Sequence, residues 1–142
     1  MWKSILLICV LCPLIVNSDP CDGCGDYKEV DVDDETVKKV ANEVFQHFSD
    51  HFYGAYRWKI ANITQAEEAK CSNEEECGKA ASYRIKVTAV VTKCLKKEVS
   101  YKDVDECEQK EDASHFYCKL SQTRNKDDIA VGYGTGCSQN ED

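Results

Sequence analysis

Cysteine offers the most chemistry in this chain, because ten of its 142 residues are cysteines. Two of them, Cys9 and Cys12, lie in the apolar stretch that begins the chain, and eight follow it. An even number of cysteines in a small exported protein predicts disulfides, four at most. The eight cysteines are Cys21, Cys24, Cys71, Cys77, Cys94, Cys107, Cys118 and Cys137.

Cys21 and Cys24 form a Cys-x-x-Cys pair, a spacing that also occurs in redox motifs and zinc sites. Export, the absence of a βαβ pattern and six further cysteines favour a structural disulfide instead. If every exported cysteine belongs to a disulfide, none is left to form a nucleophile with a histidine. We therefore expect no enzyme activity.

Two histidines have a spacing that metal ligands use. His47 and His51 are four residues apart and could share one face of a helix. The glutamate that a zinc protease carries directly after its first histidine is missing here. We therefore interpret the histidines as a solvated pair near a helix C-terminus, where the helix dipole favours them, and predict no metal site and no other cofactor.

The first eighteen residues are typical of a signal for export. One lysine precedes an apolar run that ends close to the small residue Ser18, which predicts a signal peptide over residues 1–18 and a secreted, extracellular protein. The run is too short and too close to the start for a membrane span. Asn62, in the sequon Asn-Ile-Thr, is then a predicted glycosylation site.

The exported chain would be one acidic domain over residues 19–142, since 142 less 18 leaves 124 residues, enough for one core. Removal of Lys3 takes the formal charge from −8 to −9. This charge argues against nucleic acid or an anionic membrane surface as a partner.

One predicted helix organises the elements that must position these residues. Over residues 33–50, six apolar side chains recur with the period of a helix and form one stripe. They are Val37, Val40, Ala41, Val44, Phe45 and Phe48. Asp33 or Asp34 can cap the first turn. Residues 19–32, rich in Gly, Pro and Asp, are predicted to be an N-terminal arm.

Four segments have strand patterns, at residues 56–65, 82–94, 116–123 and 129–135. The second alternates best, with one face formed by Tyr83, Ile85, Val87, Ala89 and Val91. A bulge or bend is expected near Ala61 and Asn62. The polar segments 66–81 and 95–114 are predicted to be loops, and residues 124–128 a turn. One helix packed on an antiparallel sheet is a two-layer α+β fold.

This order of elements, with cysteines in the sequences TKC, DEC, FYC and GTGC, resembles that of the secreted cystatins, inhibitors of papain-like cysteine proteases. The resemblance covers most of residues 25–137. It implies a cystatin-like fold, with the helix on a sheet of four or five strands and with disulfides Cys94–Cys107 and Cys118–Cys137.

The resemblance also bears on the other four cysteines. In cystatins the N-terminal arm and the first hairpin lie side by side, so Cys21 and Cys24 could bond to Cys71 and Cys77. We expect this crossed pairing, and the alternative is two local bridges, Cys21 to Cys24 and Cys71 to Cys77.

Cystatins inhibit through an edge of three pieces: a glycine in the arm, a first hairpin with Gln-x-Val-x-Gly, and a second hairpin with Pro-Trp. Gly25 stands where the arm glycine is expected. The first-hairpin motif falls on Glu76, Cys77, Gly78, Lys79 and Ala80, and the second hairpin holds Asn125, Lys126, Asp127 and Asp128. Neither hairpin motif is present, and carboxylates such as Glu74 and Glu75 would have to be desolvated inside a protease cleft.

Two functional hypotheses follow from the resemblance. The first is a cysteine-protease inhibitor with a remodelled edge. The alternative is a non-inhibitory binding or immunomodulatory module whose partner is another secreted or cell-surface protein. The second cystatin site, which binds legumain through an Asn after the helix, is not expected, because Ser49, Asp50 and His51 stand there.

Overall fold

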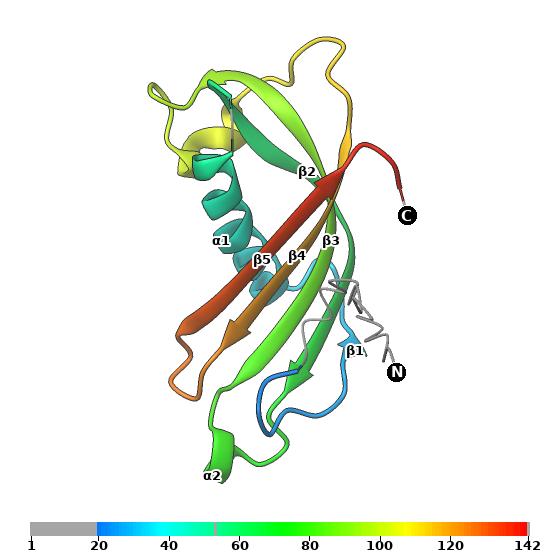
Figure 1. Ribbon diagram of the computed structural model, residues 1–142, viewed down its shortest axis with the longest axis vertical. Coiled ribbons are helices and arrows are strands. Elements are labelled where there is room, and N and C mark those ends of the chain that lie inside the picture. The colour runs from blue at the N-terminus through cyan, green and yellow to red at the C-terminus, as the bar shows by residue number, and fades with distance from the viewer. Residues whose placement is uncertain (1–19, 53, 142) are drawn as a thin grey trace, which may run out of the picture.

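The computed structural model describes residues 20–52 and 54–141, so the predicted signal peptide lies outside the described residues. Helix α1 (Glu35–His51) lies across one face of a five-stranded antiparallel sheet with strand order β1-β2-β3-β4-β5, which is the predicted α+β fold (Figure 1). The strands are β1 (Lys28–Glu29), β2 (Tyr56–Lys70), β3 (Ala81–Leu95), β4 (Phe116–Arg124) and β5 (Ala130–Ser138). Two short helical segments are α2 (Glu74–Cys77) and the 3-10 helix η1 (Tyr101–Glu106). No helix in the described part of the chain is long and apolar enough to cross a membrane.

Helix α1 begins and packs as its sequence predicts. The Asp34 side chain caps it by accepting hydrogen bonds from the backbone N-H groups of Thr36, at 2.8 Å, and Val37, at 3.3 Å. Of the six stripe residues, Phe48 is half-buried and the other five are fully buried against the sheet. Burial of a side chain such as Phe45 contributes about 2 kcal/mol, so this stripe is the centre of the core.

Strand β3 buries the predicted face, with one change of phase. Tyr83, Ile85 and Val87 are buried as expected. After Ala89, however, Val90 is buried and Val91 is only half-buried. The change occurs where β3 stops pairing with β4, since Ala89 opposite Phe116 is the last pair of that ladder.

Strand β2 is longer than predicted. The polar segment 66–81 was expected to be a loop, but residues 66–70 continue β2, and Ala66 and Ala69 are fully buried. Glu67 and Glu68 pair there with β1, which lies within the predicted arm. The two alanines supply little apolar bulk and the two glutamates between them are charged, so residues 66–70 show no clear strand pattern in the sequence. The predicted bulge is confirmed by a shift of register between Ile60 and Asn62.

The second predicted loop also contributes to the core. Residues 95–114 are largely irregular, as expected, but η1 and the residue that follows it place three buried side chains against the end of the helix and sheet. These are Tyr101, Val104 and Cys107. The Tyr101 hydroxyl donates to the Asn42 side chain of α1 at 3.1 Å, so this connection covers one end of the apolar stripe.

The four disulfides are Cys21–Cys24, Cys71–Cys77, Cys94–Cys107 and Cys118–Cys137. The last two are those implied by the resemblance. The expected crossed pairing of the first four cysteines is wrong, because both pairs close locally. A turn in which the Cys24 N-H donates to the Cys21 carbonyl at 2.8 Å brings the first pair to a Cα–Cα distance of 5.1 Å. The turn of α2 brings Cys71 and Cys77 to 5.9 Å.

Candidate protein-binding edge

Three segments far apart in the sequence meet at one end of the molecule, which we call the narrow end (Figure 1). They are arm residues 21–25, the β2–β3 loop of residues 71–80 and the β4–β5 loop of residues 125–128. The Gly25 N-H donates to the Lys70 carbonyl at 3.0 Å, which joins the arm to the first hairpin. The Lys79 N-H donates to the Lys126 carbonyl at 3.0 Å, which joins the two hairpins. All the edge residues predicted from the resemblance therefore lie within one connected region.

Backbone contacts with the first hairpin and β3 hold the arm in place from Cys21 to Gly25. The Cys21 N-H donates to the Ser82 hydroxyl at 2.9 Å, and Cys24 forms an isolated antiparallel bridge with Cys71. Gly23 has a φ of +78° and lies against Cys77, so the turn requires a glycine there. Gly25 differs, since its φ is unexceptional and an added Cβ would meet nothing within 4 Å. The described fold does not require glycine at position 25.

The first hairpin ends in an acidic tip that its disulfide closes. Asn73 caps the short helix α2 by accepting from the Glu75 N-H at 3.1 Å. Glu74, Glu75 and Glu76 are all exposed at this tip. Among the predicted edge residues of this hairpin, Lys79 is also exposed, whereas Ala80 is buried and cannot contact a partner.

Gly78 allows the two hairpins to approach each other closely. Its φ is +54°, a region that side chains disfavour, and it directly follows the last residue of α2. A Cβ at this position would lie 2.8 Å from the Lys126 carbonyl oxygen, which is closer than packing permits. Glycine is therefore required here by both conformation and contact.

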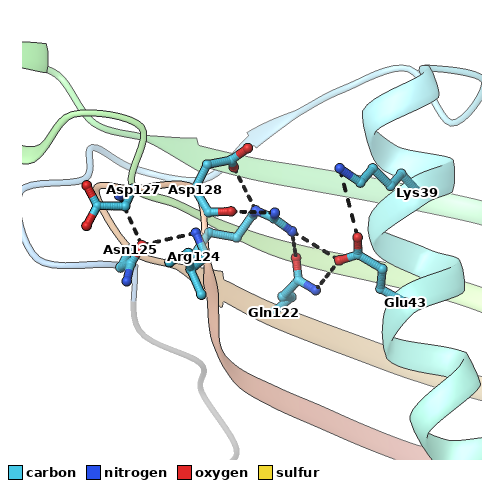
Figure 2. Close-up of polar contacts among 8 residues, drawn as sticks. Lys39, Glu43, Gln122, Arg124, Asn125, Asp127 and Asp128 are labelled. Carbon is cyan, nitrogen blue, oxygen red and sulfur yellow. Dashed lines mark hydrogen bonds and ion pairs between the residues drawn. The ribbon is translucent and has the colours of Figure 1, made fainter.

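The second hairpin is shaped by its own polar side chains (Figure 2). The Asn125 side chain accepts from the N-H groups of Asp127 and Ile129, each at 3.0 Å. Asp128 has a φ of +62°, and its carboxylate accepts from the Arg124 Nε at 2.8 Å. The side chains of Asn125 and Asp128 thus stabilise the turn, and Lys126, Asp127 and Asp128 are all exposed.

Arg124 ties this hairpin to helix α1 (Figure 2). It is only 9% exposed, and its Nη1 donates to Glu43 of α1 and to the Gln122 side chain, each at 3.0 Å. Gln122 in turn donates to the same Glu43 oxygen at 3.0 Å. From the sequence, Arg124 was predicted only to be part of a turn. An arginine at a strand end with an aspartate four residues later is nevertheless a signal for the ion pair between Arg124 and Asp128.

The Arg124 network shifts the protonation of its members. The hydrogen bond and charge of Arg124 hold the pKa of Asp128 below its ordinary value. Desolvation by itself would lower the pKa of Arg124, but the bonds and charges of Asp128 and Glu43 raise it overall. Asp128 therefore stays ionised and bound to the turn in mildly acidic solution.

The residues at the end of α1 have structural contacts. Ser49 is buried, and its hydroxyl donates to the Trp58 carbonyl at 3.3 Å, while Asp50 pairs with Arg57. His47 stacks on Tyr133 with ring centroids 5.8 Å apart, and His51 lies against the His47 carbonyl. Within residues 20–52 and 54–141, no group of three or more His, Cys, Asp or Glu side chains could hold a metal ion.

Asn62 lies away from the narrow end. It is exposed at the register shift in β2, where the bulge interrupts the strand. Thr64 of the sequon donates its hydroxyl hydrogen to the Lys86 carbonyl at 3.2 Å. The side chain of Asn62 is therefore accessible for the predicted glycan.

Comparisons with known proteins identify the class of fold. No model of a known protein family matches the chain, and no curated protein matches it. The structure described as "Crystal structure of Al-CPI" superposes with a TM-score of 0.62 at 15% identity, over 80% of this chain and 98% of that chain. "Crystal structure of dimeric human cystatin F" superposes with a TM-score of 0.61 at 15% identity, over 89% of this chain and 97% of that chain. The chain has the cystatin-like fold.

Proposed function

We propose that this chain is a secreted cystatin-like inhibitor of papain-like cysteine proteases, and that its narrow end enters the protease cleft. The observation that carries the proposal is the junction of three segments by the Gly25 to Lys70 and Lys79 to Lys126 hydrogen bonds. Because these hydrogen bonds already order the three segments in the folded protein, less conformational entropy is lost when the edge binds a partner. The cystatin-like fold supports the same conclusion.

The residues offered to the protease differ from the standard cystatin edge. The exposed candidate residues are Gly25, Lys79, Lys126, Asp127, Asp128 and the glutamates of α2. Most are charged, so the contact with the protease would be polar at its rim, and the backbone of Gly25 would come closest to the cleft. A protease with basic residues around its cleft fits the acidic tip best.

Inhibition is tested by titrating the oxidised chain into papain and measuring hydrolysis of a fluorogenic peptide. We expect inhibition at micromolar concentration or below, weakened at least tenfold by the double variant Lys126→Ala and Asp127→Ala. The matched control is Lys93→Ala and Glu108→Ala, an exposed pair at 3.3 Å that lies in β3 and the loop after η1. Absence of inhibition of papain and related proteases at micromolar concentration would refute the inhibitory role.

A non-inhibitory binding or immunomodulatory module is the second candidate. It is favoured by one observation, the three exposed carboxylates of α2 in place of the uncharged first-hairpin motif. In that case, reversal of Glu74, Glu75 and Glu76 to Lys would leave protease activity untouched and abolish binding to the cell-surface partner. Loss of papain inhibition in the same variant would support the first candidate instead.

Export and glycosylation are part of the proposal. Secretion from eukaryotic cells should yield a chain that begins at Asp19 and carries a glycan on Asn62, as measured by N-terminal sequencing and mass spectrometry. The variant Asn62→Gln should lose the glycan mass and remain secreted. A secreted chain of unmodified mass, or one that retains residues 1–18, would contradict the respective prediction.

A further inference from the structure

A small depression lies beside Asn62, where strand β2 bends. It is lined by residues 60–63 of β2 and by Val32, Asp33 and Lys38, which belong to the turn before α1 and to the first turn of that helix. Its volume is about 200 Å³. This is less than the roughly 300 Å³ at which pockets for drug-sized ligands begin, so the depression suits a group as small as one sugar ring.

The bend of β2 produces this depression. The register between β2 and β3 shifts between Ile60 and Asn62 and again between Ile63 and Gln65. Strand β1 pairs with β2 only at residues 67–68, so no described strand lies against the outer side of the bend. The bent part of β2 is therefore an open edge of the sheet, accessible to a group that is not a strand.

The lining of the depression has both apolar and polar groups. Val32, Ile60 and Ile63 pack against the core but are only half-buried. Asp33 and Lys38 are exposed, and they supply an acceptor and a donor. A pyranose ring has the matching chemistry, since its faces present C-H groups whereas hydroxyl and acetamido groups surround it. Apolar walls with a few polar groups are typical of sites for small molecules.

We propose that this depression holds the first N-acetylglucosamine of the glycan on Asn62. The inference rests on the proposed glycosylation and gives its first sugar a binding site on this chain. Asn62 itself lines the depression, so the bond to its side-chain nitrogen places the sugar beside the apolar residues. Tethering gives the sugar a high effective concentration, so it can occupy a site too shallow to retain a free sugar. The attachment point is what selects this occupant.

The bound sugar should stabilise the folded chain. The depression exists only where the turn before α1 lies beside the bend of β2, so the sugar binds the folded state and not the unfolded one. It also covers apolar surface of Val32, Ile60 and Ile63, and it shields the open edge of β2 from pairing with another chain. The later sugars of the glycan extend into solvent and should add little.

The test compares three forms of the secreted protein by thermal unfolding. Cells that attach oligomannose glycans supply the intact form, endoglycosidase H trims it to the single sugar on Asn62, and Asn62→Gln carries none. We expect the first two to unfold at the same temperature and Asn62→Gln to unfold at least about 3 °C lower. The control adds Asp112→Asn to Asn62→Gln, which creates a sequon with Ala113 and Ser114 at an exposed position. A glycan moved to that position should not restore the midpoint.

A second measurement tests the apolar contact itself. Val32→Ala should lower the midpoint more in the glycosylated chain than in Asn62→Gln, because only the glycosylated chain loses a contact with the sugar. Val30→Ala is the matched control, since Val30 is also half-buried against the core but does not line the depression. It should lower the midpoint equally in both chains.

The outcomes separate this inference from the glycosylation on which it rests. A secreted chain of unmodified mass refutes both. A glycosylated chain that unfolds at the same temperature as Asn62→Gln refutes only the binding site, and so does a glycan at Asp112→Asn that stabilises as much as the one on Asn62. Equal losses from Val32→Ala in both chains refute it too. None of these results depends on protease inhibition, because Asn62 lies away from the narrow end.

Discussion

The helix-and-sheet scaffold and the narrow end are stabilised by different interactions. In the scaffold, the stripe of α1 and the inner face of β3 exclude water over a continuous apolar core. At the narrow end, a cap, two disulfides, hydrogen bonds between loops and the Arg124 network hold segments with few buried apolar side chains. The difference teaches that the narrow end depends on a few specific polar, glycine and cysteine residues, whereas the scaffold depends on a continuous apolar core. Five variants or conditions test this division, in order of decreasing effect.

The scaffold should fail when its stripe is charged. Changing Val44 and Phe45 together to Asp places two carboxylates at positions that are 1% and 0% exposed, so we expect the domain to unfold. Circular dichroism and thermal unfolding of the oxidised protein measure this. Gln46→Asp, on the exposed side of the same helix turn, is the control and should change stability by less than about 0.5 kcal/mol. A folded double variant would contradict the two-layer packing.

The narrow end should respond most strongly to loss of Arg124. The change Arg124→Met removes the donor to the buried Gln122 side-chain oxygen and one of the two donors to Glu43, and it leaves Asp128 without its ion pair, which should lower the free energy of unfolding by about 2 to 4 kcal/mol. Lys39→Met is the control, because its 4.0 Å contact with Glu43 is exposed and contributes little. Urea unfolding measures both, and equal effects would show that the network is not what holds the second hairpin.

Removal of the first-hairpin disulfide should have a smaller, local effect. Cys71→Ser with Cys77→Ser releases a loop in which the two cysteines are six residues apart, and loop-closure entropy predicts a loss of about 2 kcal/mol. Hydrogen exchange should rise within residues 71–80 and remain unchanged in β3 and α1. Loss of protection throughout the scaffold would mean that the two regions are not separable.

Acid should weaken the second hairpin through Asp128. Its folded-state pKa is lowered from an ordinary value of 3.8 by the hydrogen bond and charge of Arg124, so its contribution is fully present well above pH 3.8. As pH falls below that value, the unfolded state takes up the proton first and stability decreases. Asp128→Asn should be less stable at neutral pH and show a shallower decrease in acid. Parallel pH profiles for the two proteins would contradict this role.

The smallest effect is expected at Gly25. Because an added Cβ meets nothing there, Gly25→Ala should change stability by less than about 0.5 kcal/mol and yet weaken protease inhibition. Gly78→Ala is the contrasting variant, since positive φ and the nearby Lys126 carbonyl should make it destabilising by about 1 kcal/mol or more. Equal stabilities for the two variants would remove the distinction between a functional and a structural glycine.

More of the scaffold than of the narrow end could be predicted from the sequence. The period of α1, its cap at Asp34 and the bulge near Asn62 are local properties, and the structure confirms each. Sequence reasoning missed the end of β2, because Ala66 and Ala69 are too small to mark a buried strand. The crossed pairing expected for Cys21 and Cys24 was also wrong. The arm and the first hairpin do lie side by side, but this proximity allows both local and crossed disulfides and does not choose between them.

By itself, the sequence determined the two-layer fold, because apolar residues at helix and strand periods must bury their faces against each other. Only the tertiary structure decided which charged residues are structural. Arg124 is buried and Asp128, although exposed, is ion-paired with it, whereas Lys126 and Asp127 face solvent, although all four lie within residues 124–128. The physical reason is that burial of a charge depends on partners distant in sequence. The pair of Arg124 with Asp128 is local, but no local pattern reveals that Glu43 of α1 also binds the Arg124 guanidinium.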